Sequence, residues 1–153
     1  MSKIYVASSW RNERQPILVG MLRAAGHEVY DFRNPDIGNK GFHWSEIDKH
    51  WKNWSPEEYR DGLCHPLAES GFECAIDAME WADTFIGLQP FGRSASLELG
   101  WAAGKGKRTI LLLDNGEPEL MVKMLDHICC TYDEVKHILM EPSSPKPNSH
   151  SGS

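Results

Sequence analysis

The segment with the greatest chemical potential reads Gly92-Arg93-Ser94-Ala95-Ser96-Leu97-Glu98-Leu99-Gly100 and lies where an apolar, strand-like run gives way to a helical pattern. Its small residues, Gly92 first among them, allow a ligand to approach the backbone. The free N–H groups at a helix start, together with Arg93, Ser94 and Ser96, favour an anion such as a phosphate. The segment therefore predicts an anion-binding loop.

Glu98 in the same segment is a candidate nucleophile. The positive end of the predicted helix favours its ionised form. A charged carboxylate at the mouth of a cleft can attack an electron-poor sugar carbon. The alternative is an ordinary first-turn glutamate that complements the helix dipole and does no chemistry, and the residues alone leave both interpretations open.

A second loop, at residues 8–12, offers similar groups after the first apolar run of the chain. Ser9 and Arg11 are candidate anion ligands, and Tyr5, in the run itself, is a candidate for the same cleft. The structural alternative makes Ser9 or Asn12 a helix N-cap and Tyr5 a core residue. With the segment at 92–100, this loop would place two arginines and three serines around one point.

Two carboxylates, Glu73 and Asp77, are spaced four residues apart on a predicted helix that leads into the third strand. That spacing puts both on one helix face. Either is a candidate general acid for a departing base. The alternative is a solvated acidic face.

The stretch 33–55 carries four aromatic rings, including Trp44, among glycine and polar residues. A loop of this length in a small domain is typical of a lid or a binding loop. One interpretation is an aromatic wall in which Trp44 stacks on a planar ligand. The other is a surface meander whose rings cover an edge of the sheet.

Apolar runs of strand type alternate with helical patterns along the chain, which predicts right-handed crossovers and a buried parallel sheet. We expect a flavodoxin-like, three-layer α/β sandwich with five parallel strands in the order 2-1-3-4-5. Ligands of such sheets bind beyond the carboxyl ends of the strands where the winding reverses, here at the loops after strands 1 and 3. The predicted strands are 3–7, 28–32, 84–88, 109–113 and 127–132, and the predicted helices are 13–25, 56–68, 71–82, 94–105 and 117–126.

The length of 153 residues and the 41% hydrophobic content predict one domain over 1–140, with a disordered tail at 141–153 that has nothing to bury. A net charge of −6 argues against binding nucleic acid or a membrane surface. The four cysteines form no C-x-x-C pair and are expected to be buried free thiols in a reducing, cytoplasmic compartment. No recognised metal-ligand spacing, Walker loop or hydrolase elbow is present, and no cofactor is expected.

The segment 82–113 contains a strand, Gln-Pro, Gly-Arg-Ser-x-Ser-x-Glu-Leu-Gly-x-Ala and a Gly-Lys before the next strand. It resembles the nucleoside 2-deoxyribosyltransferase superfamily. The opening Lys-Ile-Tyr-Val-Ala-Ser-Ser-Trp-Arg at 3–11 is similar to the first strand and loop of that superfamily, especially of the branch that hydrolyses 2′-deoxynucleoside 5′-monophosphates. The resemblance covers roughly residues 3 to 113.

The resemblance implies that Glu98 attacks C1′ of a deoxynucleoside or its 5′-monophosphate, with Tyr5 at the site and Ser9 and Arg11 on the phosphate. Where the superfamily places an acid-type aspartate, eight positions before Asp83, this chain has Ala75. Asp77, or else Glu73, is then the expected acid.

The resemblance also implies a small-molecule nucleoside or nucleotide partner and assembly as a homodimer or larger homo-oligomer. Two alternatives stay open, a non-catalytic nucleotide sensor and a glycohydrolase of NAD-like dinucleotides.

Overall fold

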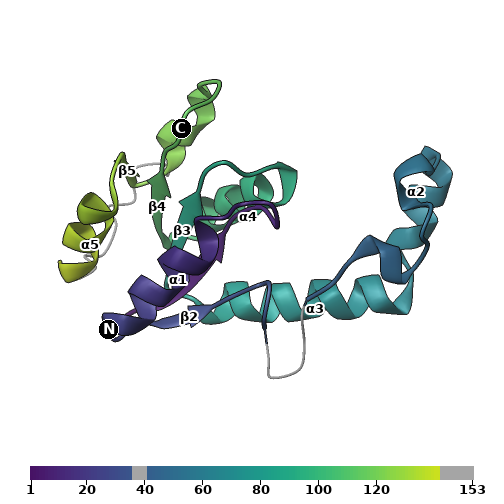
Figure 1. The fold of residues 1–153 in the computed structure, drawn as a ribbon, viewed down its shortest axis with the longest axis horizontal. Coiled ribbons are helices and arrows are strands. Elements are labelled where there is room, and N and C mark those ends of the chain that lie inside the picture. The colour runs from purple at the N-terminus through teal and green to yellow at the C-terminus, as the bar shows by residue number, and fades with distance from the viewer. Residues whose placement is uncertain (36–40, 142–153) are drawn as a thin grey trace. The chain divides into compact units, whose positions relative to one another are not determined.

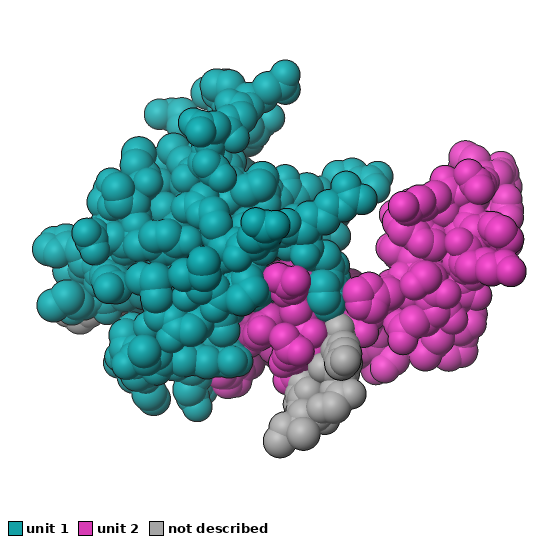
Figure 2. All heavy atoms as spheres, viewed as in Figure 1, with its two compact units in different colours: residues 1–29, 82–153 teal, residues 30–81 magenta. Residues whose placement is uncertain are grey.

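The computed structural model describes residues 1–35 and 41–141, so the tail predicted at 141–153 lies, after its first residue, outside the described residues. Its contacts divide the chain into two compact units, shown in different colours in Figure 2. Unit 1 comprises residues 1–29 and the chain from 82 onward, and unit 2 comprises residues 30–81. That residues 1–140 behave as a single domain stays a prediction.

Five strands form one sheet in the order β2-β1-β3-β4-β5, which confirms the predicted topology (Figure 1). β1 pairs with β3, β3 with β4 and β4 with β5, each in parallel. The carboxyl ends of these strands therefore share one edge of the sheet. The strands are β1 Lys3–Ala7, β2 Glu28–Tyr30, β3 Thr84–Leu88, β4 Arg108–Leu112 and β5 His127–Cys129.

One face of the sheet is covered by α1 Gln15–Ala24 and α5 Tyr132–Met140. Because side chains alternate along a strand, every second residue of β1, β3 and β4 points into this layer. The resulting core consists of aliphatic side chains and one thiol. Its fully packed members are Ile4, Val6, Leu18, Val19, Leu22, Ile86, Leu88, Ile110, Leu112, Cys129, Val135 and Leu139.

The opposite face packs against α4 Arg93–Gly104. Tyr5 and Phe85 stack there with ring centroids 5.0 Å apart. Gly87 in β3 lets α4 come close, since a Cβ at this position would lie 2.5 Å from Leu99 Cδ1. This close packing places the first two turns of α4 directly over the β1 tyrosine.

Unit 2 contains the short 3-10 helices η1 Trp44–Glu46 and η2 Trp51–Asn53, followed by α2 Pro56–Leu63 and α3 Pro66–Trp81. Ser55 caps α2 and forms a capping box with Glu58. The ring of Trp44 lies 4.9 Å from that of Phe42, 5.7 Å from that of Trp54 and 5.9 Å from that of Tyr59. These four rings form an aromatic cluster within unit 2, in which Phe42, Trp44 and Trp54 are partly buried and Tyr59 is exposed.

Glycines receive two of these rings. A Cβ on Gly62 would lie 2.7 Å from the Trp54 ring, and one on Gly71 would lie 3.0 Å from Phe42. Phe42, Trp44 and Trp54 therefore pack against one another and against α2 and α3. These contacts do not show the alternative in which the rings cover an edge of the sheet.

Three predicted elements are wrong in detail. The break expected near 69–70 lies instead before α3, because Pro66 lacks an N–H and favours a first helical turn. The helix expected at 117–126 is the shorter 3-10 helix η3, Leu120–Met124. The last strand stops at Cys129, and the unpredicted α5 follows, capped by the Thr131 hydroxyl on the N–H of Glu134.

Candidate functional site

The loops after β1 and β3 meet at the carboxyl edge of the sheet, as the strand order predicts. Ser8 Oγ donates to the Leu88 carbonyl at 2.9 Å. Asn12 Nδ2 donates to the same carbonyl at 3.0 Å and lies 3.2 Å from the Pro90 carbonyl. The two segments that the sequence singled out are therefore neighbours in space.

Glu98 and Tyr5 form the centre of this region. The Tyr5 side chain is 2% exposed, and its hydroxyl donates a hydrogen bond to Glu98 Oε2. Tyr5 is thus a core residue whose hydroxyl contacts Glu98, and its part in a reaction stays a prediction. Strand alternation explains the pairing, because Tyr5 points to the face that α4 covers.

The expected ionisation of Glu98 needs correction. Glu98 lies in the second turn of α4, whose first turn contains no acidic residue, so the helix dipole does little for it. Burial dominates and raises the pKa of Glu98 to about 8. Most molecules therefore carry a proton on this carboxyl at pH 7, and the first-turn interpretation is wrong.

The two predicted anion ligands with guanidinium groups are both exposed. Among the residues described, neither Arg11 nor Arg93 has a side-chain hydrogen bond or ion pair. Ser9 Oγ accepts from the Arg11 N–H at 3.2 Å, which shapes the loop after β1. Two cations thus remain available on the loops that flank Glu98.

The start of α4 keeps its backbone donors open. Gly92 is the N-cap and makes no side-chain cap, and a Cβ built on it would meet nothing within 4 Å. Ser94 is exposed, whereas Ser96 Oγ donates to the Gly92 carbonyl at 3.0 Å. The start of α4 therefore has the open backbone and the exposed Ser94 that the prediction of an anion site requires. The Ser96 hydroxyl already donates its proton to the backbone.

A third arginine in this region, which the sequence reading did not consider, is structural. Arg14 pairs with Asp114 at 3.2 Å, donates to the Gln89 carbonyl at 3.2 Å, and lies over the Tyr132 ring at 5.4 Å. It joins the loops after β1, β3 and β4. No local sequence pattern distinguishes this arginine from Arg11, because its partners are far away in the chain.

Asn12 is the other residue that sequence reasoning underrated. It is 2% exposed, and its Oδ1 accepts from the Arg14 N–H at 2.9 Å while its amide reaches the β3 loop. Its expected role as the helix N-cap is wrong, since α1 has Arg14 at that position. A polar residue so deeply buried needs several partners, but the sequence does not reveal burial.

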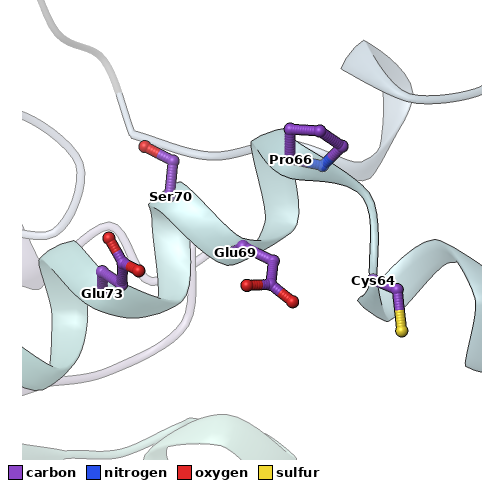
Figure 3. A pocket seen from close by; sticks show the side chains of 5 residues that line it. All are labelled: Cys64, Pro66, Glu69, Ser70 and Glu73. Carbon is purple, nitrogen blue, oxygen red and sulfur yellow. The ribbon is translucent and has the colours of Figure 1, made fainter.

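Glu73 and Asp77 both lie on α3 of unit 2 and are exposed, with Ala75 between them. Glu73 also lines an open hollow of about 500 Å³ within unit 2 (Figure 3). The hollow contains two carboxylates and a thiol but no cationic side chain, so it is a poor anion site. Its lining residues are Cys64, Pro66, Glu69, Ser70 and Glu73.

Trp44 is partly buried in the aromatic cluster of unit 2. Edge-on contacts with Phe42 and Trp54 hold the ring in place. That it stacks on a base stays a prediction.

The thiols do not match expectation. All four are free, but only Cys129 is buried, while Cys64 and Cys130 are exposed. In residues 1–35 and 41–141 no three His, Cys, Asp or Glu side chains gather as metal ligands. Within that same part of the chain, none of the helices has the length and apolar character needed to cross a membrane.

Comparisons with known proteins point to the same fold. No family model matches the sequence, and no curated protein matches it. The structure is similar to that of a 2-deoxyribosyltransferase from the bacterium Bacillus psychrosaccharolyticus, with a TM-score of 0.61 and 22% identity over 95% of this chain and 100% of that one. A CMP N-glycosidase of Clostridium botulinum matches with a TM-score of 0.49 and 19% identity over 90% of this chain and 98% of that one. The first likeness confirms the resemblance at the level of the fold.

Proposed function

We propose that this protein cleaves the N-glycosidic bond of a 2′-deoxynucleoside or its 5′-monophosphate. The observation that carries the proposal is the hydrogen bond between Tyr5, in the middle of β1, and Glu98, in the second turn of α4. The loop after β1 and the start of α4 carry Arg11 and Arg93, which have no side-chain partner among the described residues. The shared fold with a 2-deoxyribosyltransferase supports it. Residues far apart in sequence supply a nucleophile and anion ligands in one place.

In the proposed reaction, one Glu98 oxygen forms a bond to C1′ while the bond from C1′ to the base nitrogen breaks. The electron pair stays with the base, which takes a proton from an acid; we assign Asp77 to this role first and Glu73 second, from their place in the sequence. Water then attacks C1′ of the ester and releases Glu98. Two inversions give net retention, and a second nucleobase in place of water gives transfer.

Tyr5 has a specific part in this scheme. Glu98 must lose its proton before it attacks, and burial holds its pKa at about 8. A hydroxyl that donates to Glu98 Oε2 stabilises the carboxylate over the acid. The positive charge that develops on the sugar stabilises the same anion, so a high resting pKa is compatible with a nucleophile.

The phosphate of a monophosphate gives the unpaired cations a ligand. Arg11 and Arg93 can bind its oxygens, and the exposed N–H groups at the start of α4 add donors near Ser94. The absence of a 2′-hydroxyl helps the sugar carry positive charge. We therefore place 2′-deoxynucleoside 5′-monophosphates before free nucleosides as substrates, and hydrolysis before transfer.

The proposal is tested by incubating the protein with the four 2′-deoxynucleoside 5′-monophosphates and measuring free base by chromatography. Base release should fall by at least about a thousandfold in Glu98→Ala, because the bond-forming atom is gone. Glu117→Gln, an exposed carboxyl change elsewhere in unit 1, is the matched control. Base release that Glu98→Ala leaves unchanged contradicts the proposal.

A nucleotide-binding sensor is the second candidate. Two features favour it, the burial that raises the pKa of Glu98 and the alanine at position 75. Tight binding of a monophosphate without base release in the same assay would support the sensor.

We further propose that the protein works as a homodimer or larger homo-oligomer in the cytoplasm. Light scattering of the purified protein measures the first point.

A further inference from the structure

Asn12, which is 2% exposed, is a buried polar residue at the carboxyl edge that the proposed reaction does not use. Its amide nitrogen lies 2.9 Å from Ser8 Oγ, 3.0 Å from the Leu88 carbonyl and 3.2 Å from the Pro90 carbonyl. A side-chain amide has two hydrogens, so these three oxygens share them. The amide thus joins its own loop to both residues that frame the start of the β3 loop.

The other end of the same side chain is also engaged. Asn12 Oδ1 accepts from the Arg14 N–H at 2.9 Å, and the Asn12 N–H donates to the Ser9 carbonyl at 3.0 Å. The buried Asn12 therefore fixes both Ser9 and Arg14, which lie on either side of it in this turn. Arg11 lies inside the turn, and its exposed guanidinium moves with it.

The β3 loop leads directly into α4. Pro90, whose carbonyl faces the Asn12 amide, is two residues before Gly92, the N-cap of α4. Any movement of one loop against the other changes the separation between Arg11 and the α4 start. An anion that contacts both sides binds well only at one separation, because each contact weakens quickly with distance.

We propose that Asn12 is a positioning residue that holds the two loops in the register needed to bind a 5′-phosphate, and so sets the preference for nucleoside monophosphates over nucleosides. The inference rests on the proposed function for the identity of the ligand. It does not require the bond-cleaving step, because it concerns binding. Asn12 itself need not touch the ligand.

The sharpest variant is Asn12→Asp. An aspartate keeps the acceptor for the Arg14 N–H and nearly the same size, but it has no amide hydrogens and turns an oxygen towards the Leu88 and Pro90 carbonyls. Asp126→Asn is the matched control. It changes an exposed side chain that accepts from the Thr109 N–H at 2.9 Å at the opposite edge of the same sheet.

The experiment measures dissociation constants of wild type and variants for the four 2′-deoxynucleoside 5′-monophosphates and for the matching nucleosides by calorimetry. Wild type should bind the monophosphates at least about tenfold more tightly than the nucleosides. Asn12→Asp should lose most of that ratio and keep its affinity for nucleosides, whereas Asp126→Asn should keep the ratio. Thermal unfolding shows whether each variant is folded.

Three results would overturn the inference: no preference in wild type, an unchanged ratio in folded Asn12→Asp, or an equal loss for both ligand classes. If Asn12→Asp does not fold, Ser8→Ala decides the matter, because it removes one shared oxygen and leaves the amide in place. It should lower the ratio by roughly threefold, and an unchanged ratio counts against the inference. Failure of base release in wild type, with the ratio intact, would refute the proposed function and leave this inference standing.

Discussion

The two edges of the sheet in unit 1 treat their charged residues in opposite ways. At the amino edge, Arg108 donates to Ser2 Oγ, Thr84 Oγ1 and the Glu141 carbonyl, and Asp83 accepts from the Lys3 N–H and the Thr84 hydroxyl. At the carboxyl edge, Arg11 and Arg93 have no side-chain partner among the described residues. On the face that α4 covers, Glu98 is partly buried, and this burial raises its pKa.

This difference between the two edges indicates that the charged residues of one edge stabilise the fold and those of the other are available to bind a ligand. Paired charges at the amino edge connect strands and chain ends, so they contribute to folding. Unpaired cations near a buried carboxyl contribute little to folding and are the arrangement expected of a site that waits for an anionic ligand. Arg14 shows that both kinds occur at the carboxyl edge, since its partners occupy it fully.

The acid for the leaving base is the largest test of this contrast, because the proposal assigns it to α3 and not to Glu13, an exposed carboxyl on the loop after β1. Asp114 is paired with Arg14. We expect Asp77→Asn to lower the rate of base release by about a hundredfold or more, and Glu73→Gln to lower it less. Rates with a substrate whose leaving group needs no proton, such as a nitrophenyl deoxyriboside, should be spared. Equal rates for both variants and wild type would remove α3 from the reaction.

If the charged residues of the amino edge serve only stability, the pH dependence of kcat/KM for base release should reflect the ionisation of Glu98 alone. The nucleophile is active when ionised, so kcat/KM should rise roughly tenfold per pH unit below pH 8 and level off above the pKa of about 8. A profile measured between pH 5 and 9 checks this. A plateau that begins near pH 5 would show that Glu98 is ionised in the free protein.

Stability should change with pH in the opposite sense. The folded pKa of Glu98 lies above its ordinary value of 4.5, so the protonated folded state is favoured. The free energy of unfolding should therefore fall as pH rises from about 4.5 through about 8, by up to about 1.4 kcal/mol per unit. Glu98→Gln cannot ionise and should lack this loss in urea titrations at pH 5 and 8.5.

Removing an unpaired cation should affect binding and little else. Arg11→Ala is expected to raise KM for a monophosphate by about tenfold, with the melting temperature nearly unchanged, because no intramolecular partner is lost. Arg93→Ala should behave in the same way. If either variant raises KM for the unphosphorylated nucleoside equally, that arginine does not bind the phosphate.

The reverse pattern is expected for the smallest effect, at the amino edge. Arg108→Ala should lower the free energy of unfolding by about 1 to 2 kcal/mol, because three acceptors lose their donor. Its KM for a monophosphate should equal that of wild type. A changed KM with unchanged stability would break the contrast between the two edges.

The sequence was a good guide to the strands, loops and helix that position the site. It was a poor guide to the burial and the long-range contacts of the residues on them. Local patterns of apolar residues along the chain predict the strand order, the meeting of two loops and the place of Glu98 on a helix. The protonation of Glu98 does not, because burial depends on how closely α4 approaches the sheet. Arg14 and Asn12 were missed for a similar reason, since residues 75 or more positions away give them their roles.

Unit 2 is a second case in which the sequence did not show how side chains pack. Its aromatic residues suggested a lid, but α2 and α3 supply the glycines that receive Trp54 and Phe42. A list of rings along the chain cannot show whether they face each other or a ligand. The unpredicted α5 was missed because its apolar residues follow directly on the last strand.

Gly87 in β3 packs against α4, the helix that carries Glu98. A Cβ at this position would lie 2.5 Å from Leu99 Cδ1, so a larger residue would displace the Leu99 side chain, which follows Glu98 directly in α4. The absence of a side chain at Gly87 therefore contributes to the close packing that brings the proposed nucleophile to the Tyr5 hydroxyl.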